Sequence, residues 1–249
     1  MEDLVHLNAS EIDAVVFDIG GVFVIRHWEP VCRGMGRGGH TIDPDPVRFH
    51  EAHHHAVRAL SSRIDGGPID EYASDFWSHY ERAYLSHLGI GPGELDSAVA
   101  TMHHEVIGKE PKPLWRQLLV DNIAAFNRIV DAGIPVAIVS NNDGTAERQM
   151  IDFGICQVGP GSLRSVAAIV DSGALGVAKP DPAIFTPALN ALGVAAHRAL
   201  YVGDTVHADV IGATAAGMPV VQLDPYDLHG DFDHVRFPDV AAIADFLLL

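Results

Sequence analysis

The sequence predicts an α/β protein built on a doubly wound parallel sheet, with a second, small α-helical region. Short apolar runs rich in β-branched residues recur at 12–17, 134–139 and 199–202, and each leads into polar residues. Helical patterns separate the later runs, and strands that alternate with helices indicate a parallel sheet with right-handed crossovers. Between residues 45 and 107 the periodicity is helical instead, which indicates the second region.

The first run, 12–17, reads as a buried strand that carries Asp18 to a turn containing Gly20 and Gly21. Glycines at such a turn allow another group to approach the backbone closely. An open α/β sheet binds its ligands at the carboxyl ends of its strands. We therefore expect Asp18 to belong to an active site, although a strand-end Asp can also simply cap the next element.

A glycine-rich stretch follows at 33–40, where Gly34, Gly36 and Gly39 have the spacing of a dinucleotide-binding fingerprint. No strand leads directly into it and no clear helical pattern follows, so its context does not support nucleotide binding. We predict a mobile loop.

Three helices are predicted in the second region. Their apolar faces are spaced like helix surfaces, and Pro68 followed by two acids suits the start of the second helix. The aromatic residues at 72–84 are expected in the core of this region. The three faces are Phe49, Ala52, Ala56 and Leu60; Tyr72, Phe76, Trp77, Tyr80, Tyr84 and Leu88; and Leu95, Val99, Met102 and Val106.

Histidines gather on the first of these helices, and His50 and His54 have the i, i+4 spacing of metal ligands. No acid or cysteine ligand accompanies them, so an exposed or partly buried polar face is the preferred interpretation. His103 and His104 are interpreted in the same way.

The second half alternates regularly between helix and strand. The expected elements are a helix from Leu114 to Ala132 ended by Gly133, a strand at 134–139, a helix at 143–153, a strand at 166–170, a helix at 182–192, a strand at 199–202, a helix at 208–216, a strand at 219–223 and a closing helix at 238–248.

Composition narrows the function classes. The 249 residues carry 33 acids against 16 Lys and Arg, a formal charge of −17, which argues against nucleic acid or an anionic membrane as the main partner. Cys32 and Cys156 are too few for a disulfide framework or a cysteine-based zinc site. An acidic N-terminal stretch and the lack of a long apolar run argue against secretion and membrane spanning, so we expect a cytoplasmic protein. The sequence does not predict an oligomeric state.

Three later stretches give Asp18 its context: Val-Ser-Asn-Asn at 139–142, Ala-Lys-Pro-Asp-Pro at 178–182 and Val-Gly-Asp-Thr-Val-His-Ala-Asp at 202–209. In this order the chain resembles the haloacid dehalogenase superfamily, whose motifs are a nucleophilic Asp, a Ser or Thr, a Lys, and a Gly-Asp loop with paired acids. The resemblance covers most of residues 12–224. It implies a Rossmann-like core formed by residues 1–25 and 107–249, and a helical cap domain at 26–106 inserted after the first motif. Such a cap excludes water and selects the substrate.

The resemblance also implies roles for the motif residues. Asp18 would attack phosphorus and form an aspartyl phosphate, while Ser140, Asn141 and Lys179 would hold the phosphate. Lys179 is one of only three lysines in the chain. The structural alternatives are a helix-capping Ser140 and a surface Lys179.

Two carboxylates beside a phosphate, Asp204 and Asp209, call for a cation, and Mg²⁺ prefers such oxygen ligands. The resemblance assigns the metal to Asp18, the main-chain carbonyl of Gly20 and Asp204, with Asp209 binding directly or through water.

One departure concerns Gly20, because phosphatases of this superfamily usually have a second Asp there. Glycine keeps the carbonyl but lacks the side-chain general acid, whose help is typically worth ~10² to 10⁴ in rate. Three outcomes stay open: a leaving group that needs little protonation, such as an acyl, aryl or anomeric sugar phosphate; a substitute acid such as His27; or a slow or non-catalytic binder of phosphate esters.

The predicted function is Mg²⁺-dependent hydrolysis of a small phosphorylated metabolite. The alternatives are a catalytically impaired binding or regulatory protein and a haloacid dehalogenase. A dehalogenase needs no Mg²⁺ and lacks the pair found here as Gly203 and Asp204, which disfavours it. Phosphonate cleavage would need a cap lysine, and residues 26–106 contain none, unless Lys109 moves into the site.

Overall fold

The computed structural model describes residues 7–61 and 76–249, and their contacts divide the chain into two compact units. One unit comprises Met1–Phe23 and Leu118–Leu249, and the other Val24–Gln117. The predicted fold class is confirmed: the first unit contains a six-stranded parallel sheet, and the second consists mainly of helices.

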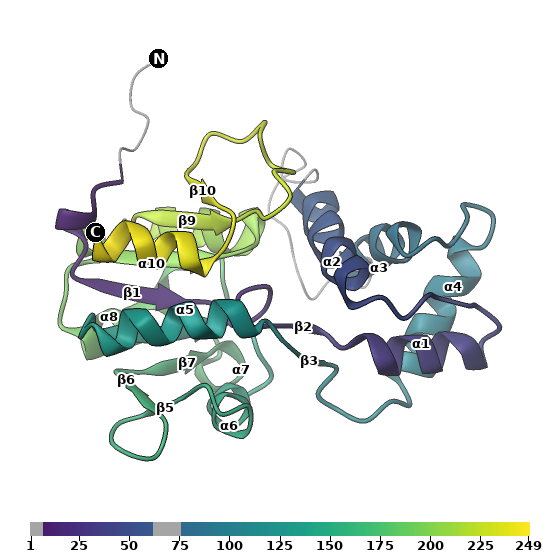
Figure 1. Ribbon diagram of the computed structural model, residues 1–249, viewed down its shortest axis with the longest axis horizontal. Coiled ribbons are helices and arrows are strands. Elements are labelled where there is room, and N and C mark those ends of the chain that lie inside the picture. The colour runs from purple at the N-terminus through teal and green to yellow at the C-terminus, as the bar shows by residue number, and fades with distance from the viewer. Residues whose placement is uncertain (1–6, 62–75) are drawn as a thin grey trace. The chain divides into compact units, whose positions relative to one another are not determined.

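The sheet has the order β10-β9-β8-β1-β4-β7, so the first strand lies in the middle. From β1 the chain runs outward through β4 to β7, returns to β8 on the other side of β1, and then runs outward again to β10 (Figure 1). Such a reversal of strand order opens a crevice at the carboxyl ends of the strands, where ligands bind. The six strands are β1 (Ala14–Phe17), β4 (Val136–Ser140), β7 (Ile169–Asp171), β8 (Ala199–Gly203), β9 (Val220–Leu223) and β10 (Arg236–Phe237).

Helices cover both faces of this sheet, which explains why its central strands are buried throughout and mostly apolar. α5 (Val120–Asp131) and α10 (Val240–Leu248) lie side by side over one face, where Phe126 of α5 meets Phe17 with ring centroids 5.7 Å apart (Figure 1). Val16 points to the opposite face and packs in one cluster with Ala188 of α8 (Thr186–Leu192) and Ala213 of α9 (Ile211–Ala215).

Shorter elements complete this unit. They are α6 (Ala146–Asp152) after β4, α7 (Ser172–Leu175) after β7, a small parallel pair of β5 (Cys156–Val158) and β6 (Arg164–Val166), a π-helical segment Val206–Val210 before α9, and 3₁₀ turns at Ala9–Glu11, Pro182–Phe185 and Ala196–Arg198.

The helical unit contains α1 (Trp28–Arg37), α2 (Pro46–Ser61), α3 (Phe76–His87), α4 (Leu95–Thr101) and a π-helical segment Met102–Ile107, together with the two-stranded pairing of β2 (Val24–Arg26) and β3 (Trp115–Leu118). Its core includes Phe49, Tyr80 and Tyr84, as the helical spacing predicts, whereas Trp77, predicted in the same core, is exposed. The predicted helix start at Pro68 and the core position of Tyr72 lie outside the described residues. That residues 26–106 act as a cap, with those boundaries, stays a prediction.

Residues 33–40, predicted as a loop, are largely helical because α1 extends to Arg37. Val31 and Met35 are buried on its inner face. A side chain at Gly34 would overlap Val106, so this glycine permits close packing of α1 against the π-helical segment. The prediction of a mobile loop there is wrong, and the helix begins before the glycines rather than after them.

The predicted helix from Leu114 to Ala132 is correct only from Val120. Its first part is strand β3, which pairs with β2 about ninety positions earlier in the chain.

The histidines of α2 are more buried than predicted, since His53 and His54 are each 2% exposed. Burial lowers the pKa of His50 to about 4 and that of His53 to about 3, so both rings are neutral at pH 7. Across 7–61 and 76–249, only three aspartates of the other unit form a group suited to a metal ion. His103 and His104 are exposed.

Among residues 7–61 and 76–249, every helix is too short or too polar to cross a lipid bilayer.

Candidate active site

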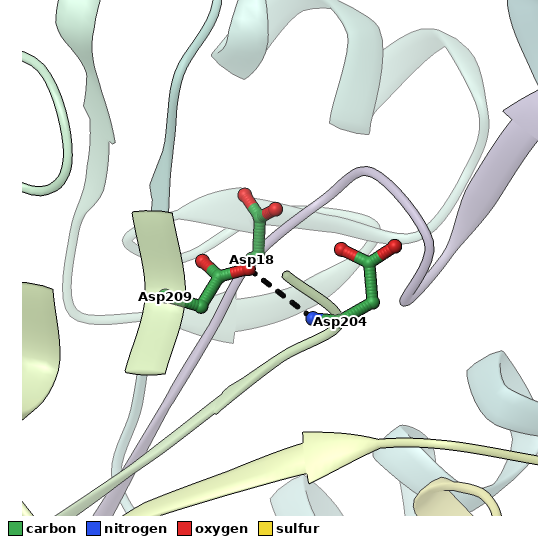
Figure 2. A group of neighbouring side chains, drawn as sticks. All are labelled: Asp18, Asp204 and Asp209. Atoms are coloured by element: carbon green, nitrogen blue, oxygen red, sulfur yellow. Dashed lines mark hydrogen bonds between the residues drawn. The ribbon is translucent and has the colours of Figure 1, made fainter. Parts of the chain in front are cut away.

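Three aspartates meet at the carboxyl edge of the sheet. Asp18 follows β1, Asp204 follows β8, and Asp209 lies in the π-helical segment after it. Each offers an oxygen within 4.8 Å of the others, and Figure 2 shows the three carboxylates turned toward a common space. Asp18 is 8% exposed, Asp204 3% and Asp209 1%, so all three are buried acids.

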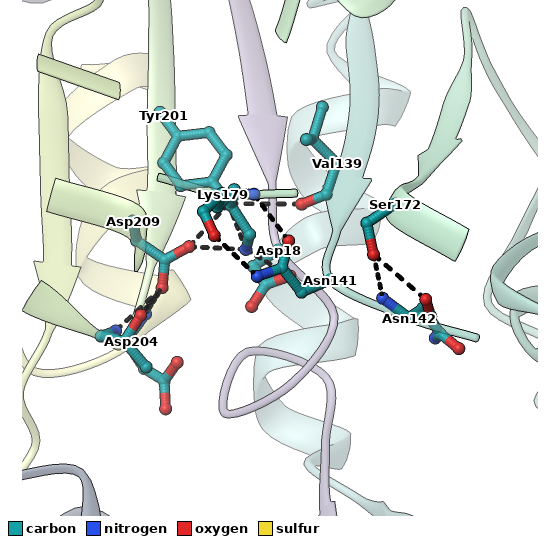
Figure 3. A network of polar contacts seen from close by, with 10 residues as sticks. Asp18, Val139, Asn141, Asn142, Ser172, Lys179, Tyr201, Asp204 and Asp209 are labelled. Atoms are coloured by element: carbon teal, nitrogen blue, oxygen red, sulfur yellow. Dashed lines mark hydrogen bonds and ion pairs between the residues drawn. The ribbon is translucent and has the colours of Figure 1, made fainter. Parts of the chain in front are cut away.

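Lys179 is the buried cation of this cluster, with 3% exposure. Its Nζ lies 3.0 Å from Asp18 Oδ1 and 2.7 Å from Asp209 Oδ1, and it donates a hydrogen bond of 2.9 Å to the Tyr201 hydroxyl (Figure 3). A surface position for Lys179 is therefore excluded.

Asn141 holds the backbone of Lys179. Its Oδ1 accepts the main-chain N–H of Lys179 at 2.8 Å, and its Nδ2 donates to the main-chain carbonyl of the same residue at 3.0 Å (Figure 3). The Asn141 amide thus fixes the lysine loop, whereas a contact of Asn141 with phosphate stays a prediction.

Both carboxylate oxygens of Asp209 are occupied. Oδ1 accepts from Lys179 and from the Tyr201 hydroxyl, the latter at 2.8 Å. Oδ2 accepts from the main-chain N–H of Asp204 at 3.2 Å, and from the N–H and hydroxyl of Thr205 at 2.9 and 2.6 Å. This carboxylate therefore organises the loop that presents Asp204.

Glycines make the close approach of the acids sterically feasible. Gly21 has a φ of +65°, and a Cβ at this position would overlap the Asp204 carboxylate. A Cβ at Gly203 would likewise overlap the Asp209 side chain. The close approach expected at the Gly20 and Gly21 turn is thus present at Gly21.

The cluster has an excess of negative charge, with three carboxylates against one ammonium. Burial, with the neighbouring carboxylates, raises the pKa of Asp18 to about 7 and that of Asp204 to about 8, against the opposing influence of Lys179. Burial also acts to raise the pKa of Asp209, but Lys179 and Thr205 outweigh it and the pKa is lowered. The pKa of Lys179 is raised because Asp18 and Asp209 outweigh its desolvation. Buried hard oxygen donors that lack counter-charge fit a divalent cation.

Ser140 is the last residue of β4 and is 4% exposed. The loop after it is held by β7, whose Asp171 accepts the N–H groups of Gly144 and Ala146, both at 2.9 Å. Ser172 Oγ accepts the N–H of Asn142 at 3.0 Å (Figure 3). Most of this loop's amides therefore stabilise its own fold.

Sequence reasoning missed Asp171, Ser172 and Tyr201. The available signals were an acid and a hydroxyl directly after the strand residue Val170, and a tyrosine inside the otherwise aliphatic run of β8. A buried Tyr hydroxyl requires a partner, so its presence at that position indicates a polar network beneath the strand end.

Two further candidates belong to the helical unit. His27 caps α1, where its Nδ1 accepts the N–H of Glu29 at 3.2 Å, and Lys109 is ion-paired with Glu105. Their suggested catalytic roles stay predictions.

A parallel α/β sheet with acids and a lysine gathered at its switch point defines a doubly wound protein with a candidate site at the carboxyl ends of its strands. The family model described as haloacid dehalogenase-like hydrolase matches residues 12–217, and the chain belongs to this family.

Several relatives are phosphatases. Phosphoserine phosphatase of Thermus thermophilus is 36% identical over 171 residues, which cover 69% of this chain but only 65% of that enzyme. Glyceraldehyde 3-phosphate phosphatase of Methanopyrus kandleri is 27% identical over 202 residues, 74% of this chain and 79% of the relative. The predicted enzyme class is a haloacid dehalogenase-like phosphatase; the hydrolase family is confirmed, and the names of these relatives agree with the phosphatase part.

Solved structures agree on the fold. The hydrolase YfnB of Bacillus subtilis, whose crystal structure is described as bound to magnesium, superposes with a TM-score of 0.57 at 14% identity and covers 96% of this chain and 99% of its own.

Proposed function

We propose that this protein is a Mg²⁺-dependent phosphatase that hydrolyses a small phosphorylated metabolite through an aspartyl-phosphate intermediate. The observation that carries the proposal is the position of Lys179 Nζ between Asp18 and Asp209, with Asp204 beside them. One nucleophile, one fixed cation and two further acids are what phosphoryl transfer requires at a single point.

In this mechanism a carboxylate oxygen of Asp18 attacks phosphorus, the new O–P bond forms, and the ester P–O bond breaks. Lys179 and the Ser140 hydroxyl contact the phosphoryl oxygens, whose charge Lys179 balances. Water then attacks the phosphorus of the aspartyl phosphate, the Asp18 O–P bond breaks, and the protons of the water remain on inorganic phosphate or pass to solvent, which regenerates the carboxylate. Because Gly20 carries no side chain, the leaving oxygen takes its proton from solvent or another group, or departs as a stable anion.

The metal would be held by Asp18, by the main-chain carbonyl of Gly20, and by Asp204. Asp209 would contribute through water, because both of its oxygens already accept hydrogen bonds within the protein. When bound, Mg²⁺ supplies positive charge between the acids and the phosphate.

The relatives support the substrate class. Phosphoserine and glyceraldehyde 3-phosphate, named in two of them, are small phosphorylated metabolites. Gly20 favours a second candidate, a slow or non-catalytic binder of phosphate esters, because the side-chain acid is absent at this position. The paired acids Asp204 and Asp209, with Gly203 before them, disfavour dehalogenation.

The test is release of inorganic phosphate from 4-nitrophenyl phosphate, with Mg²⁺ and with EDTA. Asp18→Asn should lower kcat by at least about a thousandfold without loss of folding, since it removes the nucleophile. Asp152→Asn is the matched control, because Asp152 is an exposed acid that pairs with Arg148, and it should retain wild-type rates.

An Asp18→Asn variant as active as wild type would refute the mechanism. A wild-type protein inactive on aryl and sugar phosphates, but able to bind them, would favour the second candidate instead.

A further inference from the structure

We propose that Tyr201 is a positioning residue for Lys179: its hydroxyl holds the lysine ammonium at the distance from Asp18 that the reaction needs. The inference rests on the proposed function, because it takes Lys179 to be the group that meets the phosphoryl oxygens. Tyr201 itself touches neither the nucleophile nor, in this proposal, the substrate.

Tyr201 is fixed in place by the strand that carries it. It is the middle residue of β8, is 0% exposed, and its ring packs edge-on against Phe185 with centroids 5.0 Å apart. The main-chain N–H of Tyr201 donates to the carbonyl of Pro219 at 2.8 Å. Since the backbone and the ring of Tyr201 are both held, the position of its hydroxyl beneath the strand ends is fixed.

The Lys179 ammonium has three N–H donors, two of which make hydrogen bonds. The acceptors are Asp209 Oδ1 at 2.7 Å and the Tyr201 hydroxyl at 2.9 Å, whereas Asp18 Oδ1 at 3.0 Å is an ion-pair contact (Figure 3). The two carboxylates balance the charge of the ammonium, whereas the neutral hydroxyl orients it. With two donors engaged, the ammonium has one preferred orientation, and its third N–H is left for a phosphoryl oxygen.

The hydroxyl proton of Tyr201 is also assigned. It donates to Asp209 Oδ1 at 2.8 Å, with the carbonyl of Val139 farther away at 3.3 Å. Its oxygen is therefore left to accept from Lys179. Tyr201, Asp209 and Lys179 thus form a closed triangle of hydrogen bonds, one side of which faces Asp18.

Tyr201→Phe tests this role, because it keeps the ring, its packing on Phe185 and the charge of Lys179. It leaves one N–H of a buried ammonium without its acceptor and one lone pair of Asp209 without its donor. A hydrogen bond to a charged group is worth enough to predict a fall in kcat of about tenfold to a hundredfold. KM for an aryl phosphate should change by less than about threefold, because the charge that attracts the phosphate remains.

Tyr84→Phe is the matched control. Tyr84 is also fully buried, but its hydroxyl has no hydrogen-bond partner among residues 7–61 and 76–249, and it belongs to the helical unit. Its replacement should leave kcat unchanged.

A double-mutant cycle then tests whether Tyr201 acts through Lys179. Urea unfolding is measured for wild type, Tyr201→Phe, Lys179→Met and the double variant. Non-additive effects on unfolding are expected, since the two residues share a hydrogen bond.

The outcomes separate the two proposals. If wild type hydrolyses the aryl phosphate but Tyr201→Phe keeps more than half of kcat, or if the unfolding effects simply add, the role of Tyr201 is refuted and the phosphatase proposal stands. If wild type is inactive on every phosphate ester, the proposed function fails, and the unfolding cycle alone decides whether Tyr201 positions Lys179.

Discussion

Replacing Gly21 by alanine should disable the site with little damage to the rest of the fold. Gly21 has a φ of +65°, and its would-be Cβ overlaps the Asp204 carboxylate. The substitution should therefore have two effects. It destabilises the fold because alanine disfavours the left-handed backbone conformation, and it displaces a side chain proposed to hold the metal.

Gly193→Ala measures the loss of stability from the left-handed backbone conformation alone. Gly193 ends α8 with a φ of +69°, and no atom lies within 4 Å of its would-be Cβ. A non-glycine residue in this conformation costs ~1–2 kcal/mol. For a chain of this size each kcal/mol lowers Tm by about 2–4 °C. Gly193→Ala should therefore melt about 2–8 °C below wild type and keep its kcat/KM.

Gly21→Ala should show a similar thermal loss and, in addition, lose activity. Its methyl group has to move the Asp204 carboxylate by an ångström or more, and a misplacement of that size costs about a hundredfold in rate. Mg²⁺ titrations of 4-nitrophenyl phosphate hydrolysis should show a lower kcat/KM together with a higher Mg²⁺ requirement.

A Gly21→Ala enzyme with the kcat/KM and Mg²⁺ dependence of Gly193→Ala would show that Asp204 does not need its observed position. The proposed metal site would then be wrong, even if phosphatase activity itself were present.

Two further predictions concern the missing acid and the buried histidines. Gly20→Asp should raise kcat on alkyl phosphates by about tenfold or more and change kcat on aryl phosphates little, because only poor leaving groups need the proton. An unchanged kcat on alkyl phosphates would indicate a substitute acid. Burial lowers the pKa of His53 to about 3. Below pH about 6.5 the unfolded chain therefore binds a proton at His53 that the folded chain does not bind. The free energy of unfolding consequently falls as the pH drops from 6.5 toward 3. His53→Gln should remove up to about 1.4 kcal/mol per pH unit of that slope in urea unfolding followed from pH 6.5 to 4; an unchanged slope would contradict the assignment.

The sheet was predictable because its strands are short, apolar and separated by helical patterns. The run at 199–202 matches β8, and the run at 134–139 overlaps β4, which starts two residues later. Strand β3 was not predictable in the same way. Its residues are all only half-buried, and its partner β2 lies far away in the chain, so no local periodicity marks it.

The glycines of α1 illustrate another limit of sequence reasoning. Gly34 suggests flexibility when seen alone, yet its role is to let Val106 approach, and only the packed structure provides that information. For the site, the sequence indicated Asp18, because an acid and two glycines follow an apolar run, and Lys179, because it lies in a motif and is one of only three lysines. The supporting residues Asp171 and Tyr201 were missed because the partners of their hydrogen bonds lie in distant segments, which the sequence does not identify.

The central position of β1 in the sheet affects how this chain can fold during synthesis. β1 pairs with β8 in parallel, Phe17 beside Val202, and Asp13 at its start is bound by Arg198 through two hydrogen bonds across 185 positions of sequence. When a ribosome has made the first half of the chain, this apolar strand has neither β4 nor β8 as a neighbour. The nascent chain must therefore keep β1 from non-native association until its last third emerges, and the three aspartates come together only then.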